Sequence, residues 1–213
     1  MAPDRTAGSG AGAEPYVPSS RSLKTLSTAA EECQGCELYR NATQTVFGSG
    51  SRQARILLLG EQPGDQEDRE GLPFIGPAGR VLDRALARVG IEEPDVYRTN
   101  AVKHFRWKPA PGGGKRRIHQ PPTQEQISAC RPWLLAELDA VRPDVIVVLG
   151  GSAGKSLFGS AFRVGEARGT VRTWSGIHVV VTIHPSAVLR ADDREGAFEG
   201  FVADLRTAAE VMK

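Results

Sequence analysis

The chain has 213 residues, of which 24% are charged, and a formal net charge of +2. This length fits one domain of ordinary size with a substantial hydrophobic core. A net charge so close to zero neither requires nor excludes a nucleic-acid partner, because the distribution of charge matters more than its sum. No apolar run approaches the roughly 20 residues of a membrane span, and no apolar signal segment opens the chain. We therefore expect a cytoplasmic protein without a membrane partner.

The predicted elements alternate between helix and strand after an N-terminal tail. Residues 1–21 are rich in Gly, Ala, Pro and Ser and are expected to be disordered, which leaves 22–213 as one domain. Helical spacing of apolar residues predicts helices over 23–33, 76–90, 123–142 and 195–212. Short apolar runs predict strands over 55–60, 95–102, 145–150 and 178–183.

Three single residues predict where the helices start, stop or break. Gly90 is a good residue for the C-terminal end of the helix over 76–90. Thr123 is a suitable N-cap for the helix over 123–142. Pro132 lies inside that helix and should break it near Arg131, because proline removes a helical hydrogen bond.

This alternation predicts an α/β fold, a three-layer α/β/α sandwich around a central, mostly parallel four-stranded sheet. Ligands in such folds bind beyond the carboxyl ends of the strands. The loops after Leu59, Val102, Leu149 and Ile183 should therefore lie together. Polar motifs follow the first, second and fourth strands, so we expect a site there.

The loop after the first strand carries acidic and amide side chains. The segment GEQPGDQED (60–68) contains Glu61, Gln62 and Asp65, and it continues into GLPFIGPAG (71–79), which contains Phe74. An isolated acidic loop is usually a solvated turn. The two segments together, at the end of a buried strand, favour a binding site.

The second and fourth strands end in further polar motifs. In TNAVKHF (99–105), Asn100 offers a donor and an acceptor that suit one edge of a base, although such a residue is often only a turn former. In HPSAVLR (184–190), His184 could donate to a developing negative charge, unless the His-Pro pair is only a turn. Leu189 and Arg190 could supply an apolar wedge and a phosphate contact.

The three cysteines suggest a metal site. An odd number of cysteines without an export signal argues against a disulfide framework. Cys33 and Cys36 form a C-x-x-C pair, and Cys130 adds a third thiol. This pair also fits zinc or a redox pair, and His104 is the best candidate for a fourth ligand.

A basic stretch without acidic residues follows the second strand. Residues 103–124 contain six Lys or Arg with interleaved Phe105 and Trp107, and PAPGGG (109–114) should make its middle flexible. The stretch suits phosphate binding, and the alternative is a solvated loop. The segment GGSAGKS (150–156) resembles a phosphate-binding loop, but Leu149 stands where the first glycine is required, so we interpret it as a tight turn.

Taken together, residues 23–210 resemble the uracil-DNA glycosylase superfamily, specifically the iron–sulfur family 4 enzymes and their UdgX-type relatives. The motifs that carry the resemblance are GEQPGD, GLPFIGPAG, TNAVKH, KRRIH (115–119) and HPSAVLR, in this order. Two departures from family 4 point to the UdgX type. Gln62 replaces a small residue in the first motif, and His104 replaces a cysteine cluster ligand. The KRRIH insertion is itself the hallmark of that type.

The resemblance implies a role for each residue of the site. Phe74 stacks on a flipped uracil, Asn100 reads its amide edge, and backbone groups around Gln62 complete the pocket. His184 stabilises the uracil anion as it leaves. His119 then attacks C1′ as a covalent nucleophile.

Further assignments rest on the same resemblance. Glu61 orients His119 and accepts its proton, Asp65 is the remaining acid of the loop, and Arg117 anchors the insertion, with Asp68 as its candidate partner. Uracil-containing DNA, single- or double-stranded, is the partner of an expected monomer. Its contacts are Lys103, Lys115, Arg116, Arg117, Leu189 and Arg190. A structural [4Fe–4S] cluster is expected on Cys33, Cys36, His104 and Cys130.

Two alternatives remain. One is a conventional hydrolytic uracil-DNA glycosylase that turns over, which shares every residue except the role of His119. The other is a nucleic-acid-binding module with a structural metal and no chemistry. The acidic residues after the first strand argue against the second, because carboxylates repel phosphates.

Overall fold

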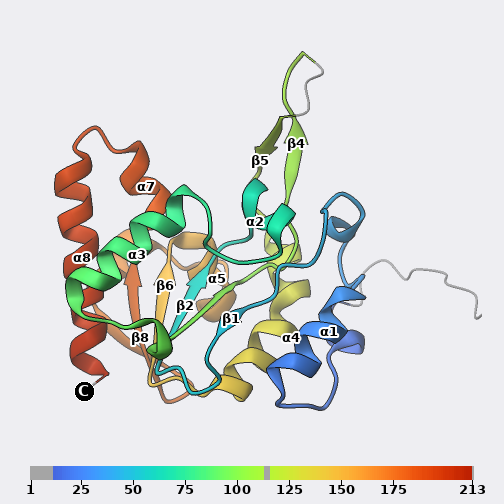
Figure 1. The fold of residues 1–213 in the computed structure, drawn as a ribbon, viewed down its shortest axis with the longest axis horizontal. Helices are drawn as coiled ribbons and strands as arrows, with labels where there is room; N and C mark the ends of the chain where they lie inside the picture. Colours follow the sequence, from blue (N-terminus) through green and yellow to red (C-terminus); the bar gives the residue numbers. More distant parts are fainter. Residues whose placement is uncertain (1–11, 113–115, 213) are drawn as a thin grey trace, which may run out of the picture.

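The fold is that of a computed structural model, which describes residues 12–112 and 116–212 (Figure 1). Residues 1–11 of the predicted tail, and Lys115 of the predicted DNA contacts, lie outside the described residues. None of the described helices is long and apolar enough to cross a membrane.

A six-stranded sheet forms the middle layer, with the strand order β1-β3-β2-β6-β8-β7. The predicted mostly parallel sheet is confirmed: β3 (Val96–Asn100), β2 (Ile56–Gly60), β6 (Val145–Leu149) and β8 (Ile177–Thr182) are parallel neighbours. The predicted number of four strands is wrong, because β1 (Ser49–Gly50) and β7 (Val171–Trp174) add antiparallel edges.

Helices cover both faces of the sheet (Figure 1). On one face, α3 (Pro77–Val89), α7 (Pro185–Arg190) and α8 (Arg194–Val211) pack on the side chains of Ile56, Leu58 and Val147. On the other, α4 (Gln124–Val141), α5 (Gly151–Phe158) and α6 (Val164–Ala167) pack on Leu57, Leu59 and Val148. Alternate residues of a strand point to opposite faces, so a fully apolar strand serves both layers.

Two smaller units lie outside these layers. The helix α1 (Leu23–Glu31) packs on α4 and, with the 3-10 turn η2 (Glu37–Arg40), forms part of a third apolar cluster that contains Cys33 and Cys130. A hairpin of β4 (Trp107–Pro109) and β5 (Arg117–His119) projects from the carboxyl end of the sheet, next to α2 (Asp65–Glu70) (Figure 1). A further 3-10 turn, η3 (Glu93–Asp95), precedes β3.

Two of the three predicted helix signals are confirmed. Gly90 ends α3 with a left-handed φ of 72°, and the side chain of Thr123 accepts a hydrogen bond from Gln126 N at the start of α4. The predicted break at Pro132 is wrong, because α4 is one continuous helix. Proline costs this helix one hydrogen bond, and burial of Trp133 and Leu134 beside it offsets the loss.

Part of the predicted tail is ordered. The 3-10 turn η1 (Glu14–Tyr16) follows Ala13, whose side chain is buried and whose N–H donates to Ala129 O of α4 at 2.7 Å. The composition of residues 12–21 is that of a tail, but these residues have a surface of α4 to pack on, which the composition does not reveal.

Candidate active site

A cavity of about 740 Å³ lies at the carboxyl end of the parallel strands. The segments after β2 and β8 line it, together with the last residue of β3 and the end of the hairpin strand β5. The lining includes every predicted catalytic and base-binding residue and two predicted DNA contacts: Glu61, Gln62, Asp65, Phe74, Asn100, His119, His184, Leu189 and Arg190. The sheet topology thus brings together motifs that are far apart in the sequence.

The floor of the cavity is formed where Asn100 and Phe74 meet over Gly60. Both side chains are largely buried. A Cβ on Gly60 would lie 2.2 Å from Asn100 Oδ1 and 2.6 Å from Phe74 Cζ, so only glycine leaves room for both. Phe74 itself has a φ of 60°, which is rare for a residue with a side chain and concentrates at functional sites. An aromatic ring and an amide therefore both border the space above Gly60.

Glu67 holds the Phe74 turn in place. Its Oε2 accepts from Gly64 N at 2.6 Å and its Oε1 from Gly76 N at 3.2 Å, so one carboxylate ties the loop after β2 to the turn around Phe74. Sequence reasoning missed this residue. Glu67 lies three residues after Gly64, the N-cap of α2, where a Glu side chain can reach back to the N-cap N–H, and this spacing was a signal that could have revealed it.

His119 and Glu61 form a pair at the cavity wall, with Nε2 3.3 Å from Oε1. Burial raises the pKa of Glu61, but hydrogen bonds from His119 and Ser152 outweigh burial and leave the pKa below its ordinary value. Glu61 is therefore an anion at neutral pH. Ser152 comes from GGSAGKS, the segment interpreted only as a tight turn, and it is a second residue that sequence reasoning missed.

The protonation state of His184 follows from its neighbours. The N–H of Ser186 donates to Nδ1 at 3.2 Å, and because a backbone N–H can only donate, Nδ1 carries a lone pair. Burial lowers the pKa of His184 to about 4, so the ring is neutral at pH 7. Its proton is then on Nε2, which makes that nitrogen a hydrogen-bond donor.

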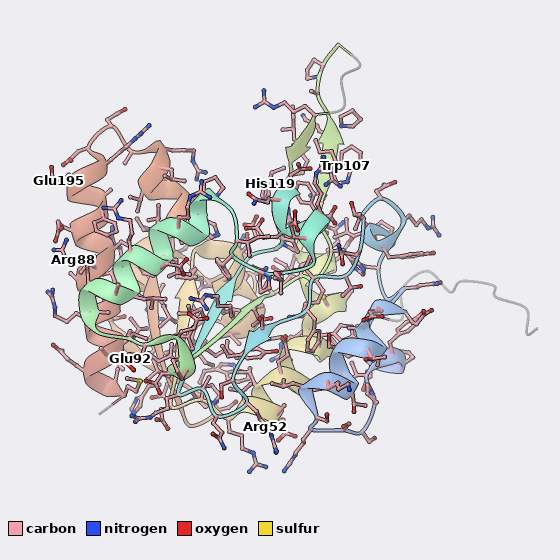
Figure 2. All side chains as sticks on the ribbon, viewed as in Figure 1. Arg52, Arg88, Glu92, Trp107, His119 and Glu195 are labelled. Carbon is pink, nitrogen blue, oxygen red and sulfur yellow. The ribbon has the colours of Figure 1, made fainter. Side chains whose placement is uncertain are left out.

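Gln62 fastens the hairpin to the sheet. Its Nε2 donates to Arg106 O at 3.2 Å and to Gln120 O at 3.0 Å, and its Oε1 accepts from Arg106 N at 3.1 Å. These backbone groups flank the two hairpin strands, and Figure 2 shows Trp107 and His119 at the lower end of that hairpin. The predicted base contact therefore has to come from the backbone of Gln62, because its side chain is engaged with the hairpin.

Arg117 fastens the hairpin a second time. Its guanidinium pairs with Asp65 and, at 2.6 Å, with the fully buried Asp68, as the sequence analysis expected for Asp68. It also lies over the rings of Phe105 and Trp107. Two carboxylates thus pair with a guanidinium whose side chain is 10% exposed, which favours the anchoring role of Arg117 over its predicted DNA contact.

Comparison with known proteins identifies the family. Residues 47–206 match the model of the Uracil DNA glycosylase superfamily. The chain belongs to this superfamily. It is 37% identical over 176 residues to a type-4 uracil-DNA glycosylase of Thermotoga maritima, with 81% of this chain and 86% of the relative covered. It is 36% identical over 165 residues to the type-4 uracil-DNA glycosylase of Archaeoglobus fulgidus, with 74% and 78% covered.

The predicted metal ligands of this glycosylase-family chain lie around one apolar cluster. Cys33, Cys36 and Cys130 pack in or against it, and the pKa of Cys130 rises to about 12 because the thiol is buried, with Cys36 and Cys33 near enough to add to the rise. The sulfurs of Cys33 and Cys130 accept hydrogen bonds from Trp133 Nε1 and Lys103 N, at 3.2 and 3.3 Å.

His104 joins this region as a neutral ring, because burial lowers its pKa to about 4. Thr45 Oγ1 donates to Ala30 O at 2.9 Å, so it accepts from His104 Nε2 at 2.9 Å and leaves Nδ1 with a lone pair. Within residues 12–112 and 116–212, no three His, Cys, Asp or Glu side chains form a group that could hold a single metal ion. Three thiols and an imidazole are nevertheless ligand types found in iron–sulfur proteins.

The predicted DNA contacts fall into two groups. Arg116 and Arg190 are exposed, and Leu189 is partly exposed at the cavity. The prediction is wrong for Lys103, whose side chain is 1% exposed and pairs with the buried Glu137 at 2.5 Å. Its ammonium points into the protein, away from any phosphate.

Proposed function

We propose that this chain excises uracil from DNA and then becomes covalently linked through His119 to C1′ of the abasic site, as the UdgX type does. Family membership and the type-4 relatives support the excision. The observation that carries the covalent step is the His119–Glu61 pair, at 3.3 Å, on the wall of the cavity.

Recognition of the base requires uracil to leave the stack, because the reacting bond is out of reach inside a duplex. Phe74 offers an aromatic face to the flipped base, and the carboxamide of Asn100 offers a donor and an acceptor to its amide edge. Cytosine presents a different pattern of donors and acceptors, so the same carboxamide discriminates against it.

Cleavage breaks the N-glycosidic bond, and its electron pair leaves with uracil. The sugar approaches an oxocarbenium ion, and the leaving base becomes an anion. Neutral His184 donates its Nε2–H to uracil O2, where that negative charge develops. The partial burial of the ring strengthens this contact, because the local dielectric is lower than in water.

Capture uses both nitrogens of His119. One nitrogen carries a proton that the Glu61 carboxylate accepts, and the other supplies the electron pair for the bond to C1′. Loss of the proton to Glu61 leaves the attached ring neutral. A nucleophile held in place has an effective concentration on the order of 10⁵ M or more, so His119 outcompetes water.

The DNA contacts in this proposal are Arg116, Leu189 and Arg190, with Lys115 as a further contact outside the described residues. Cys33, Cys36, His104 and Cys130 would hold a [4Fe–4S] cluster. Such a cluster would supply a structural crosslink between the N-terminal helix, the segment after β3 and α4. We propose that the protein acts as a cytoplasmic monomer, in a compartment where the free cysteines stay reduced.

The conventional hydrolytic glycosylase remains the second candidate, since it fits the type-4 relatives equally well. It differs only in that water, and not His119, attacks C1′. The non-catalytic binding module is disfavoured, because Glu61, Asn100 and His184 converge on one cavity in the manner of a catalytic site.

A denaturing gel separates these functions. Wild-type protein incubated with a uracil-containing oligonucleotide should give a one-to-one adduct that survives detergent and heat, and a thymine-containing oligonucleotide should give none. His119→Ser removes the nucleophile and leaves room for water, so it should release uracil and leave a free abasic site. His178→Ser, at the exposed amino end of β8, is the matched control and should still form the adduct.

Three results would contradict the proposal. A stable adduct with His119→Ser would exclude His119 as the nucleophile. Repeated turnover by the wild type without adduct would establish the hydrolytic candidate. If neither protein released uracil, only the non-catalytic binding module would remain as a candidate.

A further inference from the structure

A buried ion pair lies between β3 and α4, outside the cavity. Lys103 and Glu137 are 1% and 0% exposed, and Lys103 Nζ lies 2.5 Å from Glu137 Oε2. Removing two charges from water is costly, and apolar residues of the same volume often serve stability as well or better. The pair therefore calls for a role besides stability.

The ammonium of Lys103 makes three hydrogen bonds, one for each of its hydrogens. It donates to Glu137 Oε2, to Thr99 Oγ1 at 2.6 Å and to the backbone carbonyl of Asn100 at 2.7 Å. The carboxylate of Glu137 is also fully engaged, because it accepts from Thr99 Oγ1, from Tyr97 OH at 3.1 Å and from Gly48 N at 3.0 Å. Such saturation makes the arrangement of these groups stiff.

The bond to the Asn100 carbonyl matters because of where β3 ends. Asn100 is the last residue of the strand, paired with Gly60 of β2. The chain then turns, and the side chain of Lys103 reaches back across that turn to the Asn100 carbonyl. This contact fixes the peptide group that follows Asn100, and with it the direction in which the Asn100 side chain enters the cavity.

Little freedom is available to that side chain. The position of a Cβ on Gly60 is 2.2 Å from Asn100 Oδ1 and 2.6 Å from Phe74 Cζ, so the two groups already fill the space above Gly60. A small rotation of the Asn100 peptide would move its amide relative to the base. Displacements of about 1 Å at a reacting site can cost about 100-fold in rate.

We propose that the Lys103–Glu137 pair is a positioning device for Asn100, through which a charge pair outside the cavity sets the geometry of uracil recognition. The inference rests on the proposed role of Asn100 in reading the base. Lys103 also joins two regions, since its backbone N–H donates to Cys130 Sγ while its side chain holds Asn100.

The test replaces both charges together, with Lys103→Met and Glu137→Leu in one variant, so that no buried charge is left unpaired and the volume is kept. Uracil release is measured under single-turnover conditions at increasing protein concentration. The plateau rate should fall about 100-fold, because the base is misaligned. The half-saturating concentration should stay at the wild-type value, because neither residue faces DNA.

Arg98→Met is the matched control. Arg98 lies on β3, two residues before Asn100, and its side chain is 12% exposed, but its guanidinium pairs with Asp83 and Glu93 and not with Asn100. It should lower thermal stability without changing the plateau rate. Thr99→Val, which removes one partner of the ammonium without leaving a charge unpaired, is a milder variant that serves if the double variant does not fold.

A double-mutant cycle that includes Asn100→Ala decides whether the Lys103–Glu137 pair acts through Asn100. On the Asn100→Ala background, the double variant or Thr99→Val should cause no further loss. An additive loss, or a wild-type plateau rate in the folded double variant, would overturn this inference alone. No uracil release by the wild type, or no loss with Asn100→Ala, would overturn the proposed base reading and this inference with it.

Discussion

Gly60→Ala is the sharpest single test of the proposed base-binding site. The added Cβ would lie 2.2 Å from Asn100 Oδ1 and 2.6 Å from Phe74 Cζ, whereas ordinary contacts begin near 3.4 Å. Asn100 Oδ1 would therefore have to retreat by 3.4 − 2.2 = 1.2 Å or more. Since a displacement of about 1 Å can cost about 100-fold in rate, we expect uracil release to slow by at least about 100-fold.

The assay is single-turnover release from a uracil-containing oligonucleotide, with abasic sites revealed by alkali and adducts counted on a denaturing gel. Both products should fall together, because the change acts before the bond to uracil breaks. Gly151→Ala is the matched control, since a Cβ there meets nothing within 4 Å and the residue is helical. It should release uracil at the wild-type rate.

A folded Gly60→Ala variant that releases uracil at the wild-type rate would refute the reasoning. It would show that Asn100 and Phe74 do not form the base-binding slot as the structure places them. Thermal unfolding distinguishes the expected slow release from damage to the fold. The variant should stay folded, because the clashing atoms are side-chain atoms at the cavity and the sheet hydrogen bonds of β2 are retained.

Three further predictions concern the cofactor, the acid stability and the DNA contacts. Anaerobically purified protein should be brown, with about four iron and four sulfide ions per chain. Cys130→Ala should lose the iron and the sulfide and unfold at lower temperature, whereas His104→Cys should keep both. Stoichiometric zinc in a colourless protein would exclude the cluster. Because the pKa of His184 is about 4 in the fold, below its ordinary value, the unfolded chain binds more protons between pH 6.5 and 4. The free energy of unfolding should then fall as the pH drops through that range, by at most about 3 kcal/mol from this residue. In urea unfolding, His184→Gln should show a weaker dependence of this free energy on pH. The same pH dependence as in the wild type would contradict the neutral, buried state assigned to His184. Arg116→Glu should weaken DNA binding irrespective of sequence and reduce its salt dependence in a titration series, and an unchanged salt slope would remove Arg116 from the interface.

The central strands could be predicted from the sequence because each is an uninterrupted apolar run. β2, β6 and β8 are buried on both faces for most of their length, and only a strand or a buried helix gives that pattern. The edge strands could not be predicted in this way. β7 is mostly exposed and β1 has two residues, so their pairing depends on the neighbour they meet and not on their own composition.

The candidate site also has a part that could be predicted from the sequence and a part that could not. The convergence of Asn100 and His184 on one cavity could be predicted because the carboxyl ends of parallel strands meet, whatever lies between them in sequence. The burial of Lys103 could not be predicted, since its place in a basic stretch says nothing of Glu137, which lies 34 residues away on a helix that packs beneath the strand. The hydrogen-bond partners of Gln62 and Ser152 could not be predicted either, because tertiary contacts bring these partners together.

The hairpin changes how capture by His119 should be understood. The glycines of PAPGGG predicted a flexible middle of the basic stretch, but in the structure His119 lies beside Glu61, on a strand paired with β4. Gln62 and Arg117 attach this hairpin to the loop after β2, which also carries Glu61. The proposed nucleophile and its proposed base are thus held by one connected set of contacts. In the proposed mechanism their separation does not depend on closure, so the high effective concentration expected to favour His119 over water would be present before uracil leaves.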